Sequence, residues 1–146
     1  IVFKFDDTVF YSTLLSGEFF SYKALLRDEH KISTNVSKKE FQLAVERASL
    51  LAREDRANLI KLNIRDKYIN IKSNSEIGDV FEKVKTSENE EELDIAFNSR
   101  YILDGVKILE SEEITLNFTD SVNPLIITES DDDSYIYLVL PVRLAG

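Results

Sequence analysis

The sequence contains, at residues 37–53, the stretch SKKEFQLAVERASLLAR, which has the pattern of an amphipathic helix. Ser37 suits the N-cap position, and Glu40 follows at the capping-box spacing. At about 100° per residue, one arc collects the core-facing residues Phe41, Ala44, Val45, Ala48, Leu51 and Ala52. A polar stripe collects Lys39, Gln42, Glu46, Ser49 and Arg53. A smaller apolar patch, on neither arc, holds Leu43 and Leu50 beside Arg47.

A second helix is predicted over residues 99–109, with Asn98 as its cap. Its buried arc is expected to contain Tyr101, Ile102, Gly105, Val106, Ile108 and Leu109, and its polar line holds Arg100, Asp104 and Lys107. Alternating apolar residues predict strands at 57–65, 68–73, 77–86, 93–97, 113–118, 124–129 and 134–142, with an extended stretch at 32–36. The order is a strand-helix-three-strand unit used twice. This predicts an α+β fold with two helices packed on one face of a curved antiparallel sheet.

The first 31 residues differ from this pattern. Residues 1–5 and 8–15 predict two strands around the Asp6-Asp7 turn, and 18–31 is an irregular segment that we interpret as a linker. Because the chain opens on Ile1 inside an apolar alternating segment, we expect it to be a piece of a longer protein.

Composition excludes several classes of protein. The 146 residues are 43% hydrophobic, which is typical of a globular chain with one full core and part of a second. The sequence has neither an apolar run long enough for a membrane span nor a signal-peptide pattern. It has no cysteine, which excludes disulfides, thiol catalysis and zinc–thiolate sites and fits a cytoplasmic protein.

The net charge of −9 at first argues against nucleic acid as a partner. The charge is uneven, however. Segment 76–96 has six more acidic than basic residues, segment 110–133 has eight acidic residues and no base, and segment 38–53 has two more basic than acidic residues. Acid therefore lies mainly in predicted strands and loops, and the surplus base lies on a helix. We expect the polar stripes of the two helices to lie together on the outer face of the helix layer.

An enzyme is the main rival class. Asp131, Asp132 and Asp133 could bind a divalent cation, but such a run between two strands is more typical of a solvated loop. His30 is the single histidine and has no nucleophile partner in the sequence. Neither a P-loop nor a G-x-G-x-x-G motif occurs. We therefore expect no catalytic residue, no metal site and no cofactor.

Four segments of the sequence resemble the family of the bacterial DNA polymerase III beta subunit, the beta sliding clamps: Ser73–Gly78, Phe97–Asp104, Phe118–Pro124 and Tyr137–Leu144. The resemblance covers essentially the whole chain. It implies that residues 1–31 are the C-terminal remnant of the second clamp domain plus a linker, and that 32–146 are the third domain. An acidic protein-interaction module unrelated to replication remains the alternative.

The family forms a ring of two subunits around duplex DNA, with helices lining the hole and sheets outside. The resemblance therefore implies a non-catalytic processivity factor that tethers DNA polymerase III alpha, clamp loader subunits and other clamp-motif proteins. DNA would be held loosely, without sequence specificity, through long cations and intervening water. The candidates that face DNA are Lys38, Lys39, Arg53, Arg100 and Lys107. Their alternative role is that of ordinary solvated helix residues.

The resemblance also implies a hydrophobic cleft between the second and third domains that binds a partner peptide. The matching positions are Ala24, Leu25, Asn98, Tyr101, Val122, Pro124, Leu138, Val139, Leu140, Pro141, Val142 and Arg143. Two positions depart from the family: Phe20 stands where Pro is usual, and Ala24 where a basic residue is often found. Leu138 and Leu140 could instead belong to a terminal strand packed in the core. Because most of the second domain is missing, we expect weakened peptide binding.

A subunit interface is the third implication. By the resemblance, two parts of the chain would contact the neighbouring subunit: Leu50 and Leu51 on the first helix, and the strand through Gly78, Val80 and Glu82. Core packing is the alternative for Leu51. The family's full-length chain is a homodimer, whereas this chain, which lacks a first domain, is expected to be a monomer or to form a nonphysiological pairing of exposed strands.

Overall fold

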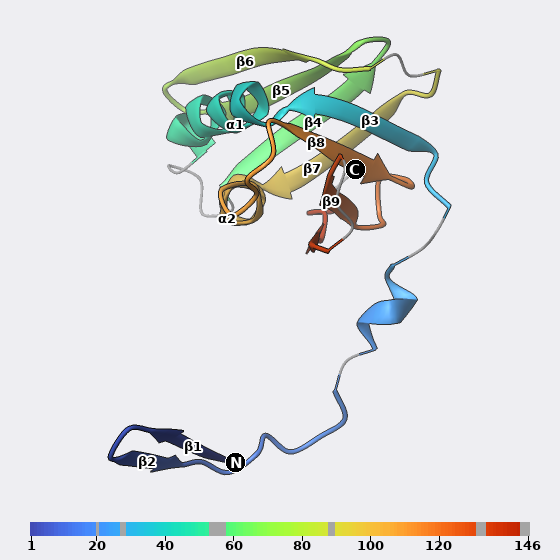
Figure 1. Cartoon of the computed structure of the whole chain (residues 1–146). Helices are drawn as coiled ribbons and strands as arrows, with labels where there is room; N and C mark the ends of the chain where they lie inside the picture. The colour runs from blue at the N-terminus through green and yellow to red at the C-terminus, as the bar shows by residue number, and fades with distance from the viewer. Residues whose placement is uncertain (20, 27–28, 53–57, 88–89, 131–133, 144–146) are drawn as a thin grey trace.

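The computed structural model describes residues 1–19, 21–26, 29–52, 58–87, 90–130 and 134–143. Both predicted helices are present: α1 spans Lys38–Ala52 and α2 spans Ser99–Val106. The main strands follow the predicted order: β3 (Ile32–Ser37), β4 (Leu59–Arg65), β5 (Tyr68–Ser75), β6 (Gly78–Lys85), β7 (Leu93–Asn98), β8 (Glu113–Phe118), β9 (Leu125–Glu129) and β10 (Ile136–Val139). The strand-helix-three-strand unit therefore occurs twice, and the α+β class is confirmed (Figure 1).

The eight strands form two antiparallel four-stranded sheets, in the orders β6-β5-β4-β7 and β10-β9-β8-β3. Each unit lends its first strand to the sheet of the other unit. β3 pairs with β8, with Ile32 opposite Phe118, and β7 pairs with β4, with Phe97 opposite Ile60. The predicted curved sheet is thus made of two sheets whose strands interlock the two halves of the domain.

The two sheets approach each other at both ends. Between β3 and the end of β6, Val36 and Thr86 form an isolated bridge, and the Ser87 amide donates to the Asn35 carbonyl at 3.2 Å. On the other side, the chain after β10 runs along β7, and the Val142 amide donates to the Ala96 carbonyl at 2.8 Å. These bonds give the edge strands β3 and β7 some of the pairing that a free edge lacks.

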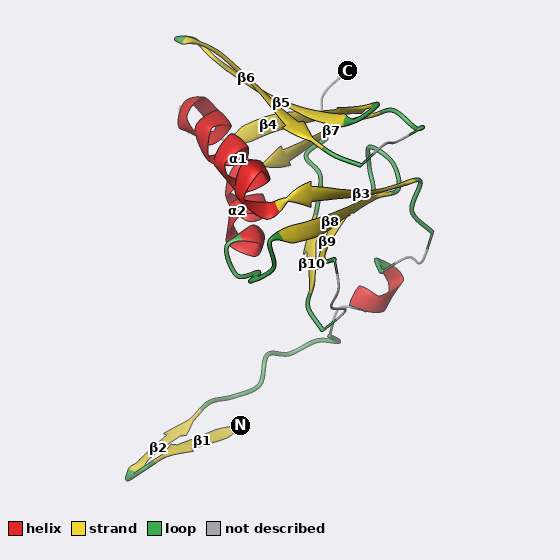
Figure 2. Cartoon of the chain, turned by 45° about the horizontal axis from the view of Figure 1, so that its top comes forward, coloured by secondary structure: helices red, strands yellow, loops and turns green. Residues whose placement is uncertain are grey.

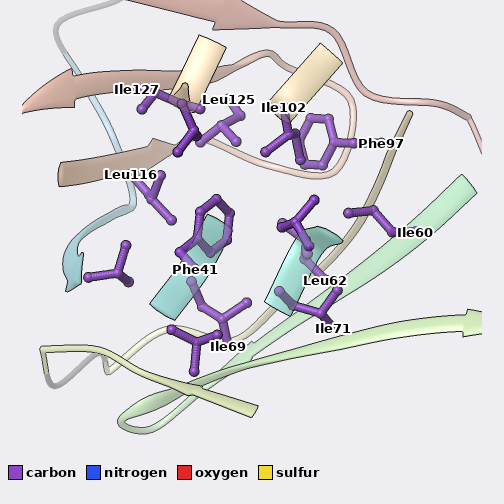
Figure 3. Packing of buried hydrophobic residues seen from close by; sticks show 14 of the residues in the cluster. Phe41, Ile60, Leu62, Ile69, Ile71, Phe97, Ile102, Leu116, Leu125 and Ile127 are labelled. Atoms are coloured by element: carbon purple, nitrogen blue, oxygen red, sulfur yellow. The ribbon is translucent and has the colours of Figure 1, made fainter. Parts of the chain in front are cut away.

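A single hydrophobic core lies between the sheets and the helices. Figure 2 shows α1 and α2 next to each other, on the same side of both sheets. Phe41 of α1 and Ile102 of α2 point into the core, where they meet residues of both sheets (Figure 3). Because alternate strand residues and one helix arc are apolar, these elements can bury those faces together.

The N-termini of both helices are capped by the predicted residues. The Glu40 amide donates to the Ser37 hydroxyl at 3.4 Å, and the Arg100 amide donates to Asn98 Oδ1 at 3.0 Å. Such caps satisfy backbone amides that have no partner within the helix. α1 therefore begins directly after β3, and α2 begins directly after β7.

Several details of the predicted helix faces were wrong. Tyr101 is 56% exposed and Ile108 is 63% exposed, whereas Leu103 is buried. The cause for Ile108 is that α2 ends at Val106, three residues before the predicted end. On α1, the predicted polar residue Ser49 is buried, and its hydroxyl donates to the carbonyl of Glu46 in the preceding turn of the same helix at 2.7 Å.

The first 31 residues lie apart from the core (Figure 1). Strands β1 (Val2–Phe5) and β2 (Thr8–Tyr11) form a hairpin in which every residue is exposed, and β2 is shorter than predicted. A single 3₁₀ turn, η1 (Tyr22–Ala24), interrupts the linker. Leu25, Leu26 and His30 of the linker are half-buried.

Candidate functional site

The predicted cationic face is formed by the two adjacent helices. Lys39 on α1 and Arg100 on α2 are exposed. Lys107, just beyond α2, reaches Glu46 of α1, with 3.9 Å between Nζ and Oε1. Because both side chains of this ion pair are partly exposed to solvent, the pair is weak, and Lys107 can bind another anion instead of Glu46. The structure therefore brings three of the predicted cations onto one surface.

Lys38 has a different environment from the other cations. Its side chain is half-buried, and its ammonium donates to the carbonyl of Leu109 in the loop after α2. This bond ties the start of α1 to the end of the segment that follows the second helix. The charge of Lys38 thus lies at the border of the helix face. Arg53 falls outside the described residues.

A polar groove of about 380 Å³ runs between the two helices. The side chains that line it from α2 and its end are Arg100, Leu103, Asp104 and Lys107, with Ser49, Asn58 and Ser99 completing the wall. The groove carries two cations and one carboxylate, so it can attract an anion weakly but has no closed pocket to hold one. This suits contact with a mobile polyanion better than retention of a small ligand.

A second, less polar groove of about 520 Å³ lies where the C-terminal segment crosses β7. Its walls are Asp94, Ile95, Ala96, Ser121, Val122, Val142 and Arg143. Of these, Val122, Val142 and Arg143 were predicted to bind a partner peptide. The hydrogen bond from Val142 to Ala96 holds one wall against the other. An apolar floor with polar residues at its rim can accept an aliphatic side chain of an extended peptide.

The position of Val122 is fixed by a turn built on Asp120. Asp120 Oδ1 accepts hydrogen bonds from the backbone amides of Val122 at 2.9 Å and Asn123 at 2.8 Å. The Asn123 side-chain amide donates to Oδ2 at 2.8 Å. The bonds from Val122 and then Asn123 lower the pKa of Asp120 below its ordinary value, because they stabilise the charged carboxylate. The turn leaves the Val122 side chain 59% exposed at the groove.

The other predicted peptide-binding residues have mixed positions. Val139 is buried in the core, Leu138 is half-buried and Leu140 is exposed. Pro124 is buried and Pro141 half-buried, Asn98 is occupied as the α2 cap, and Tyr101 is exposed. From the linker, Leu25 is half-buried, and the surroundings of the Ala24 side chain are not described. The groove itself therefore draws on β7 and the C-terminal segment more than the prediction did.

Sequence reasoning missed Asp94, Ile95, Ala96 and Ser121 as groove residues. The period-two pattern of 93–97 does identify a strand, but it does not reveal which segment lies beside it. The contact between residues 96 and 142, which are distant in sequence, brings these walls together.

The predicted interface residues lie on and beside the edge strand β6. β6 pairs with β5 on one side, and no strand in the described part of the chain pairs with its other edge, apart from the isolated bridge at Thr86 just beyond its end. Leu50 is 63% exposed, Leu51 is half-buried, and Val80 packs partly against the core. Gly78 is the first residue of β6, directly after the β5–β6 turn, and has a φ of +149°, a conformation that favours glycine.

Glu82 of β6 is held by Arg47 of α1 in a two-bond pair. Arg47 Nε donates to Oε1 at 2.8 Å, and Nη2 donates to Oε2 at 2.7 Å. The hydrogen bond from Arg47 lowers the pKa of Glu82. The pair thus orients the edge strand relative to the first helix beside the exposed Leu43 and Leu50.

Within the described residues, no cluster of three histidine or carboxylate side chains has metal-binding geometry. Asp131, Asp132 and Asp133 lie outside that part of the chain. Neither of the two described helices is long and apolar enough to cross a membrane.

Comparisons with known proteins agree with this geometry. Residues 23–143 match the family "DNA polymerase III beta subunit, C-terminal domain". The chain is 41% identical to the beta sliding clamp of Bacillus subtilis over 98% of its own length and 39% of that protein. It resembles the crystal structure of a DNA polymerase sliding clamp from Bacillus subtilis, with a TM-score of 0.86, 40% identity, and coverage of 99% of this chain and 39% of that one. For the beta subunit from Thermotoga maritima, the TM-score is 0.84 and the identity 35%, over 88% and 35% of the two chains.

Proposed function

Since the chain belongs to the DNA polymerase III beta subunit family, we propose that it forms part of a sliding clamp. It spans about 39% of the length of the curated relatives that it matches. In this proposal, residues 32–146 are the third domain of the clamp, and 1–31 are the end of the second domain plus a linker. The whole protein would encircle duplex DNA as a cytoplasmic homodimer and act as a non-catalytic processivity factor.

The observation that carries the proposal is the helix pair. α1 and α2 lie side by side, with Lys39, Arg100 and Lys107 at their surface and the core beneath them. A surface of separated, hydrated cations attracts phosphates without reading base edges. This is the property that a protein needs if it is to hold DNA and still move along it.

In the same proposal, the groove beside β7 binds the hydrophobic anchors of partner peptides, including those of DNA polymerase III alpha and the clamp loader. Val122 and Val142 would contact an aliphatic anchor, and Arg143 would contact the peptide's polar groups. Buried apolar anchors dominate the energy of such peptide complexes. We also propose that Leu50, Leu51 and the open edge of β6 contact the first domain of the neighbouring subunit.

The peptide site can be tested by titrating the ¹⁵N-labelled chain with a short peptide that carries two aliphatic anchors. We expect the largest NMR shift changes at Ala96, Val122 and Val142. Replacing both anchors of the peptide with serine supplies the matched control and should remove the changes. Shifts confined to other surfaces, or equal shifts with the serine peptide, would contradict the assignment. Affinity equal to that of a full-length clamp would contradict the expected contribution of the second domain.

A further inference from the structure

The face of β4, β5 and β6 that points away from the helices carries a concentration of exposed lysines. The inward positions of these strands hold core residues such as Ile60, Leu62, Ile69 and Ile71. By alternation, the outward positions of the same strands include the exposed side chains of Lys61, Lys72, Lys83 and Lys85. No carboxylate in the described part of the chain forms an ion pair with any of these four lysines.

The lysines are placed close together by the strand register. Lys61 lies directly opposite Lys72 in the β4–β5 pair. Like charges at directly opposed positions repel each other and destabilise a sheet. A hollow of about 320 Å³ adjoins these two lysines and is lined also by Leu59, Ser73 and Asn74. A bound anion beside these two lysines would relieve the repulsion.

Two aromatic rings, those of Tyr68 and Phe81, lie among the same lysines. Lys72 lies over the ring of Phe81, with 5.7 Å from Nζ to the centroid, and Lys83 lies over Tyr68 at 3.7 Å. These contacts hold the ammonium groups near the sheet surface. Tyr68 is 37% exposed and has a lysine on its ring, whereas Phe81 is 60% exposed and its lysine is farther away. Phe81 is therefore the ring with a face available for stacking.

The net charge of the rest of this sheet surface does not cancel the lysines. Near β7, Arg65 pairs with both Glu92 and Asp94, with 3.2 Å between Nη2 and Oδ1 of Asp94. Asp79 accepts a hydrogen bond from Asn74 at 2.6 Å at the far end of the hairpin. The four lysines carry four positive charges, whereas Arg65 with Glu92 and Asp94 has a net charge of −1 and Asp79 adds another −1. This part of the surface therefore stays positive, although the chain as a whole is acidic.

We propose that this surface, formed by Lys61, Lys72, Lys83, Lys85, Tyr68 and Phe81, binds single-stranded nucleic acid. An antiparallel sheet that displays an exposed aromatic ring among cations allows a base to stack while lysines contact the adjacent phosphates. An acidic peptide would satisfy the lysines but would leave Phe81 without a specific role. The surface lies on the face opposite the helices, so this binding is separate from the proposed contact with duplex DNA.

The proposal is tested with the full chain by fluorescence anisotropy, using a labelled oligothymidylate of about 12 nucleotides. We expect weak binding at low salt whose logarithmic salt slope is about −3, since single strands give about 0.7 per neutralised phosphate. The double variant Lys72→Gln/Lys83→Gln should weaken binding about tenfold and reduce the slope by about 1.4. Phe81→Ala should weaken binding about fivefold or more without changing the slope, because it removes stacking only.

The double variant Lys4→Gln/Lys23→Gln is the matched control, because it removes two exposed lysines far from the sheet. It should leave oligothymidylate affinity nearly unchanged. Equal weakening by both double variants, or no oligothymidylate binding at low salt, overturns the proposal. If a polyglutamate peptide of the same length binds as tightly as the oligonucleotide and Phe81→Ala has no effect on either, the surface binds acidic peptide and the proposal is also overturned.

Discussion

At the residue scale, Gly105 shows how closely α2 approaches the last strand. A Cβ atom at this position would lie 2.1 Å from Cδ1 of Tyr137 and 2.6 Å from its Cγ. These are ring atoms close to the strand backbone, so they cannot move aside without shifting β10. The absence of a side chain at position 105 is therefore a packing requirement.

This contact predicts an unusual effect of a helix substitution. Gly105→Ala ordinarily stabilises a helix interior by roughly 1 kcal/mol. Here we expect the free energy of unfolding to fall by about 1–2 kcal/mol, because overpacking outweighs the gain in propensity. Urea unfolding checks this, with Asp104→Ala on the exposed side of the same helix as the control. A stability equal to or above that of the wild type would show that Tyr137 moves freely.

Asp120 predicts a pH dependence at the same scale. Its pKa is below the ordinary 3.8 in the folded state, so ionised Asp120 stabilises the fold above about pH 4. The contribution is lost as the pH falls through the folded pKa. Asp120→Asn should therefore be less stable than the wild type at pH 7, and the difference should shrink below pH 4.

Urea midpoints at several pH values measure this difference. Asp66→Asn, at the exposed β4–β5 turn, corrects for the general loss of one negative charge. A difference between Asp120→Asn and wild type that stays constant down to the acid transition would mean that the carboxylate charge does not stabilise the turn.

The residue-scale prediction from sequence was good for α1 and poorer for α2. In α1, five of the predicted core residues are fully buried, since the helix is long enough to define its face. In α2, Leu103 replaces Tyr101 and Ile108 in the core. In a helix of eight residues, moving the predicted end by a few residues changes which side chains belong to the buried face. The boundary residues of α2 therefore could not be assigned from periodicity alone.

At the element scale, the junction of the two sheets depends on Ser87. Its hydroxyl lies 2.8 Å from the buried Thr34 hydroxyl and accepts from the Asn35 amide at 3.1 Å. These bonds join β3 to the segment after β6. They add side-chain support to the isolated bridge between Val36 and Thr86.

We expect Ser87→Ala to lower the free energy of unfolding by about 1–2 kcal/mol, because a partly buried network loses a partner. Ser33→Ala, at an exposed position of β3, should change it by less than about 0.5 kcal/mol. Thermal unfolding followed by circular dichroism measures both. Equal effects of the two substitutions would indicate that the junction is held by the backbone alone.

Strand existence was predicted for every main strand, but strand partnership was not. Alternation of apolar residues specifies which face of a strand is buried, and this was sufficient to identify the repeated unit. β3 and β7 each join the sheet of the other unit through contacts that are distant in sequence. The paired residues of β3 and β8, for example, are more than fifty positions apart. No local pattern contains that information, so the groove beside β7 could be predicted only through the family resemblance.

At the scale of the whole molecule, the core begins at Ile32 and does not include the hairpin. The linker contributes one described side-chain bond, from the Thr119 hydroxyl to the Glu29 carbonyl at 3.4 Å. A chain that starts at Glu29 should therefore unfold at the same temperature as the full chain, within a few degrees. Differential scanning calorimetry tests this. A loss of cooperativity in the shorter chain would show that residues 1–28 stabilise the domain.

The distribution of charge was only partly predictable at this scale. The sequence indicated cations on the helix layer, but it also suggested that acidic side chains would cover the solvent-facing side of the sheets. Among the described acidic residues of 76–96, Glu76 and residues 90–92 lie in a turn and a loop, and Asp79, Glu82 and Asp94 lie in β6 and β7. The outward positions near the end of β6 are Lys83 and Lys85. Counting charge over a segment mixes the two faces of a strand, and the faces become distinct only with the register.

The central claim is that the surface of the adjacent helices faces duplex DNA. Paramagnetic relaxation in the ¹⁵N-labelled chain, mixed with a spin-labelled duplex at low salt, detects such weak contact directly. We predict broadening of amides in α1 and α2, around Lys39 and Arg100, and its loss in Lys39→Gln/Arg100→Gln. Broadening confined to the outer face of β4–β6 or to the groove beside β7, with the helix amides unchanged, would contradict the account.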